Sequence, residues 1–245
     1  MTNKTHERRS ILIINPNSTE SMTRGLEPLV DSLNFKETNH TFFTSPTGPT
    51  SINDETDAAD SARHALPHLL PLLPQHSGFL VACYSKHPLV PLLKSKSPAT
   101  PVTGIFEASV ATALQLIAPD ERFGIVSTGK VWEGILSEAV ADLLGAGGSA
   151  RFAGVETTGL TATGLHDAPA EEVRRRMKDA VKRLLRKDGA RVGAVCLGCA
   201  GMAGMGEMVR EACVEELGEE GRRVRVVDGV QAGVAWLEGA VRSDF

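Results

Sequence analysis

Short apolar runs alternate with longer segments of helical spacing along this chain, and that alternation limits the fold more than any other feature. The runs occupy residues 11–14, 78–83, 102–105, 123–126, 151–155, 192–197 and 224–227. They are rich in β-branched residues and lack strict polar alternation, which is typical of strands covered on both faces. Because helical segments separate them, the sequence predicts an α/β fold with mainly parallel sheets flanked by helices.

The helical spacing is clearest in three of the intervening segments. They span residues 53–73, 131–144 and 170–186. The stretch from Ser51 to Asp54 offers a capping box for the first segment, and Gly145 stops the second. The third is highly charged, with apolar residues recurring from Val173 to Leu185.

Two strand ends recur at nearly the same distance along the chain. The turn around Asn15 resembles the turn around Ser127, 112 positions later, and the strand end at Cys83 resembles the one at Cys199, 116 positions later. This repeat predicts two pseudo-symmetric α/β halves. We assign residues 1–105 with 220–245 to the first half and residues 106–219 to the second. The last strand and helix are left over after the repeat, and we expect them to return to the first half.

Composition restricts the partners of the protein. The formal net charge is −4 and aromatic residues make up 4% of the chain, so neither a basic face nor a base-stacking surface for nucleic acid is expected. No stretch approaches the ~20 apolar residues of a membrane span, and the polar N-terminus does not resemble a signal peptide. We therefore predict a cytoplasmic homo-oligomer with reduced thiols and a small-molecule substrate, without nucleic acid or membrane as partners.

Two motifs resemble cofactor or metal sites but lack the required context. The segment from Gly124 to Lys130 spells a phosphate-binding loop, yet Val131 stands where a magnesium-binding Ser or Thr is needed. Cys196 and Cys199 fit a CxxC pattern, but no second CxxC or His pair follows. We expect no metal and no cofactor.

Four polar turns follow the predicted strands at Asn15, Cys83, Ser127 and Gly198. Open parallel sheets bind ligands at the carboxyl ends of their strands, so these turns are the candidate site. Two of them carry a cysteine, one in each half, and facing halves would place both thiols in one cleft. A helix is expected after each cysteine, and its N-terminus would lower the thiol pKa.

The quoted turns also carry a family resemblance. Residues 14–23, Ile-Asn-Pro-Asn-Ser-Thr-Glu-Ser-Met-Thr, resemble the opening of the hydantoin racemase family in the aspartate/glutamate racemase superfamily. Segments 82–83, 101–108, 123–128, 197–202 and 227–230 match that family in the same order. After the first cysteine, the segment from Tyr84 to Pro88 departs from the Phe-Gly-Asp-Pro of many bacterial members and resembles a fungal branch associated with allantoin breakdown.

The resemblance implies two flavodoxin-like halves and cofactor-independent racemisation of a cyclic ureide such as allantoin or a 5-substituted hydantoin. One thiolate would remove the proton beside a ring carbonyl, and the opposite thiol would reprotonate the other face. Cys83 and Cys199 are the expected acid/bases. The expected substrate-binding residues are Asn15, Asn17, Tyr84, Ser85, Phe106, Thr128, Gly129 and Gly198.

Several of these residues have a purely structural alternative. Asn15 and Asn17 also suit a turn without a ligand, and Phe106 suits the core as well as a pocket wall. His87 could tune Cys83 or begin a helix at the surface, and Glu107 is more typical of the first turn of a helix than of a catalyst.

Two other functions stay open from the sequence. One is another enzyme of the superfamily, a decarboxylase or a cis–trans isomerase. The other is a non-catalytic protein that binds a small ligand or has a regulatory role. A single-cysteine decarboxylase needs no second proton donor, so the two cysteines favour a racemase. A mere binder would not exchange the substrate α-hydrogen.

Overall fold

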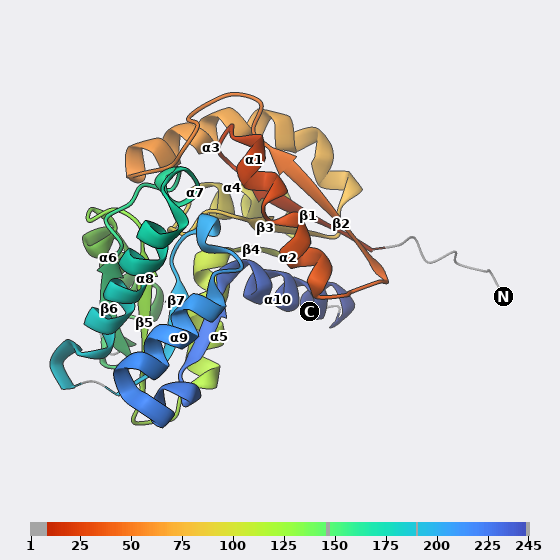
Figure 1. The fold of residues 1–245 in the computed structure, drawn as a ribbon. Coiled ribbons are helices and arrows are strands. Elements are labelled where there is room, and N and C mark those ends of the chain that lie inside the picture. Colours follow the sequence, from red (N-terminus) through yellow and green to blue (C-terminus); the bar gives the residue numbers. More distant parts are fainter. Residues whose placement is uncertain (1–8, 146–147, 190, 244–245) are drawn as a thin grey trace.

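Two parallel sheets of four strands each form the framework of the computed structural model, which describes residues 9–145, 148–189 and 191–243 (Figure 1). The first sheet has the order β2-β1-β3-β4 and the second the order β6-β5-β7-β8. The strands are β1 (Arg9–Asn15), β2 (Thr38–Thr44), β3 (Gly78–Val81), β4 (Val102–Gly104), β5 (Arg122–Ser127), β6 (Phe152–Thr157), β7 (Val192–Leu197) and β8 (Arg225–Asp228).

Helices connect the strands in both halves. They are α1 (Glu20–Arg24), α2 (Glu27–Ser32), α3 (Glu55–Leu69), α4 (Leu89–Lys96), α5 (Ile105–Leu116), α6 (Trp132–Leu144), α7 (Gly164–Asp167), α8 (Ala170–Leu185), α9 (Gly206–Leu217) and α10 (Gly229–Ser243). Short 3₁₀ turns lie among them, including η4 (Ala200–Met202) directly after Cys199.

Each sheet is covered on both faces, as the apolar runs predict. In β1, Leu12 and Ile14 pack with α3 and α4, whereas Ile11 and Ile13 face the core that contains α5 and α10. Figure 1 shows α3 and α4 on the opposite side of the first sheet from α10. In the second sheet, α8 and α9 cover one face and α5 and α6 the other.

The predicted pseudo-symmetry is confirmed by the strand order and by matching hydrogen bonds. Each strand of the second sheet takes the place of the strand four earlier in the chain. The residue before each candidate cysteine donates its N–H to the neighbouring strand: Ala82 to the Ile14 carbonyl at 2.8 Å, and Gly198 to the Val126 carbonyl at 2.7 Å. Both cysteines therefore lie two residues beyond a central strand, held in the same way.

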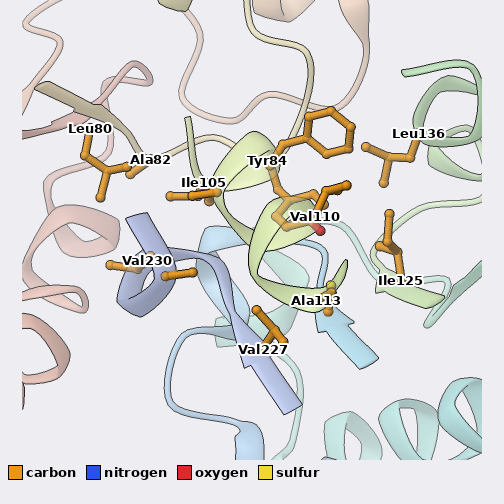
Figure 2. Close-up of a cluster of buried hydrophobic side chains, with 14 of the residues drawn as sticks. Leu80, Ala82, Tyr84, Ile105, Val110, Ala113, Ile125, Leu136, Val227 and Val230 are labelled. Atoms are coloured by element: carbon orange, nitrogen blue, oxygen red, sulfur yellow. The ribbon is translucent and has the colours of Figure 1, made fainter. Parts of the chain in front are cut away.

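One hydrophobic core joins the halves. It contains side chains of the first sheet, such as Leu80, together with side chains of the second, such as Ile125 and Val227. Figure 2 shows Leu80 and Ile125 on opposite sides of α5, which runs between the sheets. Relative movement of the halves would have to disturb this shared core.

Two features differ from the sequence-based picture. Strand β2 was not expected, because its sequence Thr-Asn-His-Thr-Phe-Phe-Thr is largely polar, as an edge strand allows. The segment 220–245 is divided between the halves: β8 pairs with β7 in the second sheet, whereas α10 packs against β3 of the first. No described helix has the length and apolar composition needed to span a membrane.

Candidate active site

The strand ends of both sheets meet at one pocket between the halves. Seven of the ten predicted site residues line it: Asn15, Asn17, Cys83, Tyr84, Thr128, Gly198 and Cys199. The pocket is completed by Met22, Leu26, Ile52, Ala82, Trp132, Ala162, Ala200 and Gly201. The two cysteines reach it from different halves, after β3 and after β7.

Three predicted binding residues lie outside the lining. Phe106 is buried in the core, where its ring packs edge-on against Tyr84 with centroids 5.7 Å apart. Ser85 lines a neighbouring pocket that also borders Trp132, and its Oγ lies 3.6 Å from the Cys83 Sγ. Gly129 is half-buried and follows Thr128 without lining the pocket. Of the predicted site residues, only those that line this pocket are placed to contact a substrate held in it.

Both thiols are only partly exposed, and the protein around them disfavours the thiolate. Burial raises the pKa of Cys83 to about 12, although a hydrogen bond from the Ser85 hydroxyl stabilises the thiolate and opposes that rise. Burial also raises the pKa of Cys199 to about 11, and the N–H groups of Gly201 and Met202 oppose that rise. A negative charge on Cys199 contributes to the raised pKa of Cys83, which places the two sulfurs within electrostatic reach of each other.

The expectation that helix N-termini lower the thiol pKa values is wrong for this structure. The segment after Cys199 is one 3₁₀ turn, whose Gly201 N–H lies 3.4 Å from the sulfur. The helix after Cys83 begins only at Leu89. Loss of solvation outweighs these dipoles, so both thiols are neutral at pH 7.

The first polar turn locks its own amide groups. The Asn15 Nδ2 donates to the Asn17 Oδ1, the Thr19 carbonyl and the Thr23 Oγ1, and the Asn15 Oδ1 accepts the Asn17 N–H. The Asn17 Oδ1 also accepts the Thr19 N–H at 2.9 Å. Asn15 thus holds the turn, and this network fixes the orientation of the Asn17 amide.

That orientation leaves the amide nitrogen of Asn17, a residue that lines the pocket, with only a weak partner. Its Nδ2 contacts only the Met22 sulfur, at 3.3 Å, among the residues that the structure describes, and thioether sulfur is a poor acceptor. In the second half, the Thr128 hydroxyl has no hydrogen-bond partner within the described part of the chain, although Thr128 is buried and lines the pocket. Each half therefore presents one available donor.

The second half holds Cys199 through a close backbone approach. The Ser127 Oγ donates to the Gly198 carbonyl at 2.7 Å, and a Cβ on Gly198 would lie 2.7 Å from the Ile125 Cγ2 and 2.8 Å from the Val126 carbonyl oxygen. Only glycine fits there without displacing β5. Because Gly198 has no Cβ, the Cys199 turn can pack directly against the end of β5.

Tyr84 connects the pocket to a polar cluster in the core. Its hydroxyl lies 2.7 Å from the Ser109 Oγ on α5, and the Cys196 Sγ donates weakly to the Ser109 carbonyl. Burial raises the pKa of Cys196 to about 12. Cys196 is therefore a buried structural thiol within β7. Cys213 in α9 is also buried and structural.

His87 and Glu107 are outside the pocket. His87 is buried, not at the surface: its Nδ1 accepts the Leu89 N–H, and its Nε2 contacts the Ser61 hydroxyl. Burial lowers the pKa of His87 to about 4, so it is neutral and can accept the Leu89 N–H at the start of α4. Glu107 lies in the first turn of α5, where burial raises its carboxyl pKa.

Sequence reasoning missed the apolar lining. Leu26, Trp132 and Ala162 come from helix starts and a loop that no motif marks. Met22 lies within the matched segment 14–23 and Ile52 within the capping stretch 51–54, but neither stretch predicted an apolar pocket wall. Their only common signal is that each lies within a few residues of a polar turn or a helix N-terminus. Together they make the pocket largely apolar.

The lining contains no Asp, Glu, Lys, Arg or His among the described residues. The described residues also contain no group of three or more His, Cys, Asp or Glu placed to hold a metal ion. What the pocket offers is two thiols, two uncharged hydrogen-bond donors and an apolar wall. This set suits acid–base chemistry on a neutral molecule, because a buried charge would lack a counterion.

Comparisons with known proteins agree with the architecture. The family model described as Asp/Glu/Hydantoin racemase matches residues 11–237. The chain is 35% identical to an uncharacterized protein of Schizosaccharomyces pombe, over 96% of this chain and 93% of that protein. It is 29% identical to a hydantoin racemase of Pseudomonas sp. (strain NS671), over 94% of this chain and 85% of the relative. The solved structure of an allantoin racemase from Klebsiella pneumoniae has a TM-score of 0.78 and 26% identity, covering 96% of this chain and 88% of that one.

Proposed function

Because this chain is a racemase that belongs to the Asp/Glu/hydantoin racemase family, we propose that it interconverts the enantiomers of a neutral cyclic ureide, allantoin or a 5-substituted hydantoin. The observation that carries the proposal is a pocket with two thiols from opposite halves and no charged side chain in its described lining. A free amino acid or a dicarboxylate would bury charge there without a partner, at a large cost in free energy.

The proposed reaction is a proton transfer through an enolate. One thiolate removes the ring hydrogen beside the carbonyl, and the electron pair of the broken C–H bond moves into the ring so that negative charge develops on oxygen. The thiol on the other side then gives its proton to the opposite face of the planar carbon. The two cysteines have exchanged protonation states, so the site can now accept the other enantiomer, or it returns to its first state by exchanging protons with solvent.

The two thiols start from different states in this scheme. Burial raises the pKa values of both thiols; backbone N–H groups oppose the rise at Cys199, and the Ser85 hydroxyl opposes it at Cys83. Whichever cysteine is ionised removes the first proton, and the other, still protonated, supplies the second. Because both values are raised, whichever thiolate forms is a strong base, which suits abstraction of a weakly acidic C–H.

Asn17 and Thr128 are the proposed donors to the ring oxygens. Both are uncharged, both line the pocket, and one comes from each half. A donor fixed before the reaction stabilises the developing enolate without having to reorganise. The bonds from Asn15 supply that fixation for Asn17.

Replacing Asn17 by Asp is expected to lower kcat by about 10²–10³-fold, the loss typical of one missing donor to a developing oxyanion. Asp keeps an oxygen that accepts from Asn15 and Thr19 but has no N–H for the substrate. The measurement is racemisation by polarimetry, with circular dichroism as a check on folding. Ser18→Ala is the control, since that hydroxyl bonds to carbonyls of the 48–49 loop, and activity like wild type in Asn17→Asp would refute the assignment.

Chelation is expected to leave the activity unchanged, because two thiols suffice for the proton transfers. Dialysis against EDTA followed by the same racemisation assay, with nothing added back, measures this. A loss that added metal restores would reveal a catalytic ion and contradict the proposed mechanism.

The proposed substrate class is tested with a panel of single enantiomers. Hydantoins with different 5-substituents, allantoin and free amino acids are each incubated with the protein, and the decay of optical rotation is followed. We expect decay for cyclic ureides and none for the charged amino acids. The reverse result would contradict a neutral substrate.

A further inference from the structure

Asp228 connects the Cys199 turn to the start of α10. It is the last residue of β8 and pairs in register with Leu197, two residues before Cys199. Its carboxylate is buried and accepts three backbone N–H groups. The Oδ1 accepts from Val230 at 2.9 Å and Gln231 at 3.3 Å, and the Oδ2 accepts from Gly204 at 3.2 Å.

The two oxygens serve two different segments. The Oδ1 caps the N-terminus of α10, and the Oδ2 holds the loop that follows Cys199. Within that loop, the other backbone bonds recorded among the described residues are local, such as Met202 N–H to the Cys199 carbonyl at 3.0 Å. The bond from Gly204 is thus the loop's tie to the end of β8.

The body of α10 is held against the first half. A Cβ on Gly233 would collide with Leu80 of β3, so the helix axis lies very close to the strand that ends just before Cys83. Figure 2 shows Val230, in the first turn of α10, beside Leu80 and Ala82. Helix α10 therefore packs on β3, the strand that precedes Cys83, while Asp228, which caps α10, holds the loop that follows Cys199.

We propose that Asp228 is a positioning residue that sets the Cys199 thiol against its face of the substrate, through the Gly204 N–H. The inference rests on the proposed function, since it concerns the same two-thiol reaction. Asp228 does not line the pocket, so its effect on the reaction passes through the loop.

Asp228→Asn separates the two roles of the carboxylate. The amide oxygen can still accept from Val230 and Gln231, which preserves the cap. The amide nitrogen then faces the Gly204 N–H, and two donors cannot bond to each other. The loop after Cys199 is released while α10 keeps its start.

The probe is each enantiomer of 5-(chloromethyl)hydantoin. A thiolate takes the hydrogen at C5, the electron pair of that C–H bond forms a double bond to the exocyclic carbon, and chloride leaves with the electrons of the C–Cl bond. The reaction needs only the abstracting thiolate and no second proton donor. Initial chloride release from each enantiomer therefore reports on one thiol, and Cys199→Ser identifies which enantiomer depends on Cys199.

In Asp228→Asn, release from the Cys199-dependent enantiomer is expected to fall about 10²-fold, the cost of an ångström-scale misplacement. Release from the other enantiomer should stay near the wild-type rate. Asp54→Asn is the matched control, because Asp54 caps α3 in the same way and should leave both rates unchanged.

Equal losses for both enantiomers, no loss, or a loss confined to the Cys83-dependent enantiomer would each overturn the role of Asp228. If wild-type protein releases chloride from neither enantiomer, the proposed function itself fails, and the positioning role fails with it. Chloride release by the wild-type protein therefore tests the proposed function, and the comparison with Asp228→Asn tests the positioning role.

Discussion

Replacing either Cys83 or Cys199 by serine is expected to lower the rate of racemisation by about 10³-fold or more. A serine hydroxyl occupies nearly the same space but is far too weak an acid to act as a thiolate would, so each variant loses one of the two proton transfers. Polarimetry on the purified variants measures the loss, and thermal unfolding checks that the fold is kept.

Two other cysteines provide matched controls for this experiment. Cys196 lies in the core beside Ser109, and Cys213 is buried in α9, so neither reaches the pocket. Cys196→Ser and Cys213→Ser should retain activity. Turnover like wild type in Cys83→Ser or Cys199→Ser would refute the two-thiol mechanism.

The second large effect is expected from pH. Since burial raises the pKa values of Cys199 and Cys83 to about 11 and about 12, both thiols are protonated near neutrality. The fraction of protein with one thiolate then grows about tenfold for each pH unit far below the lower pKa. We expect kcat/KM to rise by about 10²-fold between pH 6 and pH 8, because that parameter follows ionisation of the free enzyme.

The direction of this effect separates two views of the site. A thiol whose pKa is lowered by a helix N-terminus would already be ionised near neutrality, and kcat/KM would level off around pH 7. A thiol whose pKa is raised by burial gives a continuous rise with pH. A plateau below pH 8 would therefore show that the dipoles of the turn outweigh burial in solution.

Much of the framework follows from local sequence patterns. Runs such as 192–197 are apolar on both faces because helices cover both sides of the sheet, and such runs mark central strands well. The near-equal offsets from Asn15 to Ser127 and from Cys83 to Cys199 predicted the repeat. In the structure, the N–H groups of Ala82 and Gly198 anchor the two cysteine turns in the same way.

The remaining features depend on contacts between distant segments. Strand β2 lies at a sheet edge and needs no apolar run, so its polar sequence hid it. Trp132 and Ile52 line the pocket only because the two halves meet there. That Asn15 holds the turn while the Asn17 amide nitrogen stays available follows only from the whole hydrogen-bond network. The thiol pKa values depend on burial by both halves. Short-range patterns carry none of this information.

The most direct test of the two-thiol account is the fate of the α-hydrogen during racemisation in D₂O. A single enantiomer of a substrate identified by the panel is followed by NMR and chiral chromatography at low conversion. Because one thiol removes the hydrogen and the other delivers a solvent deuteron to the opposite face, the inverted product should carry deuterium in nearly every molecule, while the remaining starting enantiomer keeps its hydrogen. Deuterium entering the starting enantiomer as fast as the product, or a product that retains hydrogen, would contradict two thiols acting from opposite faces.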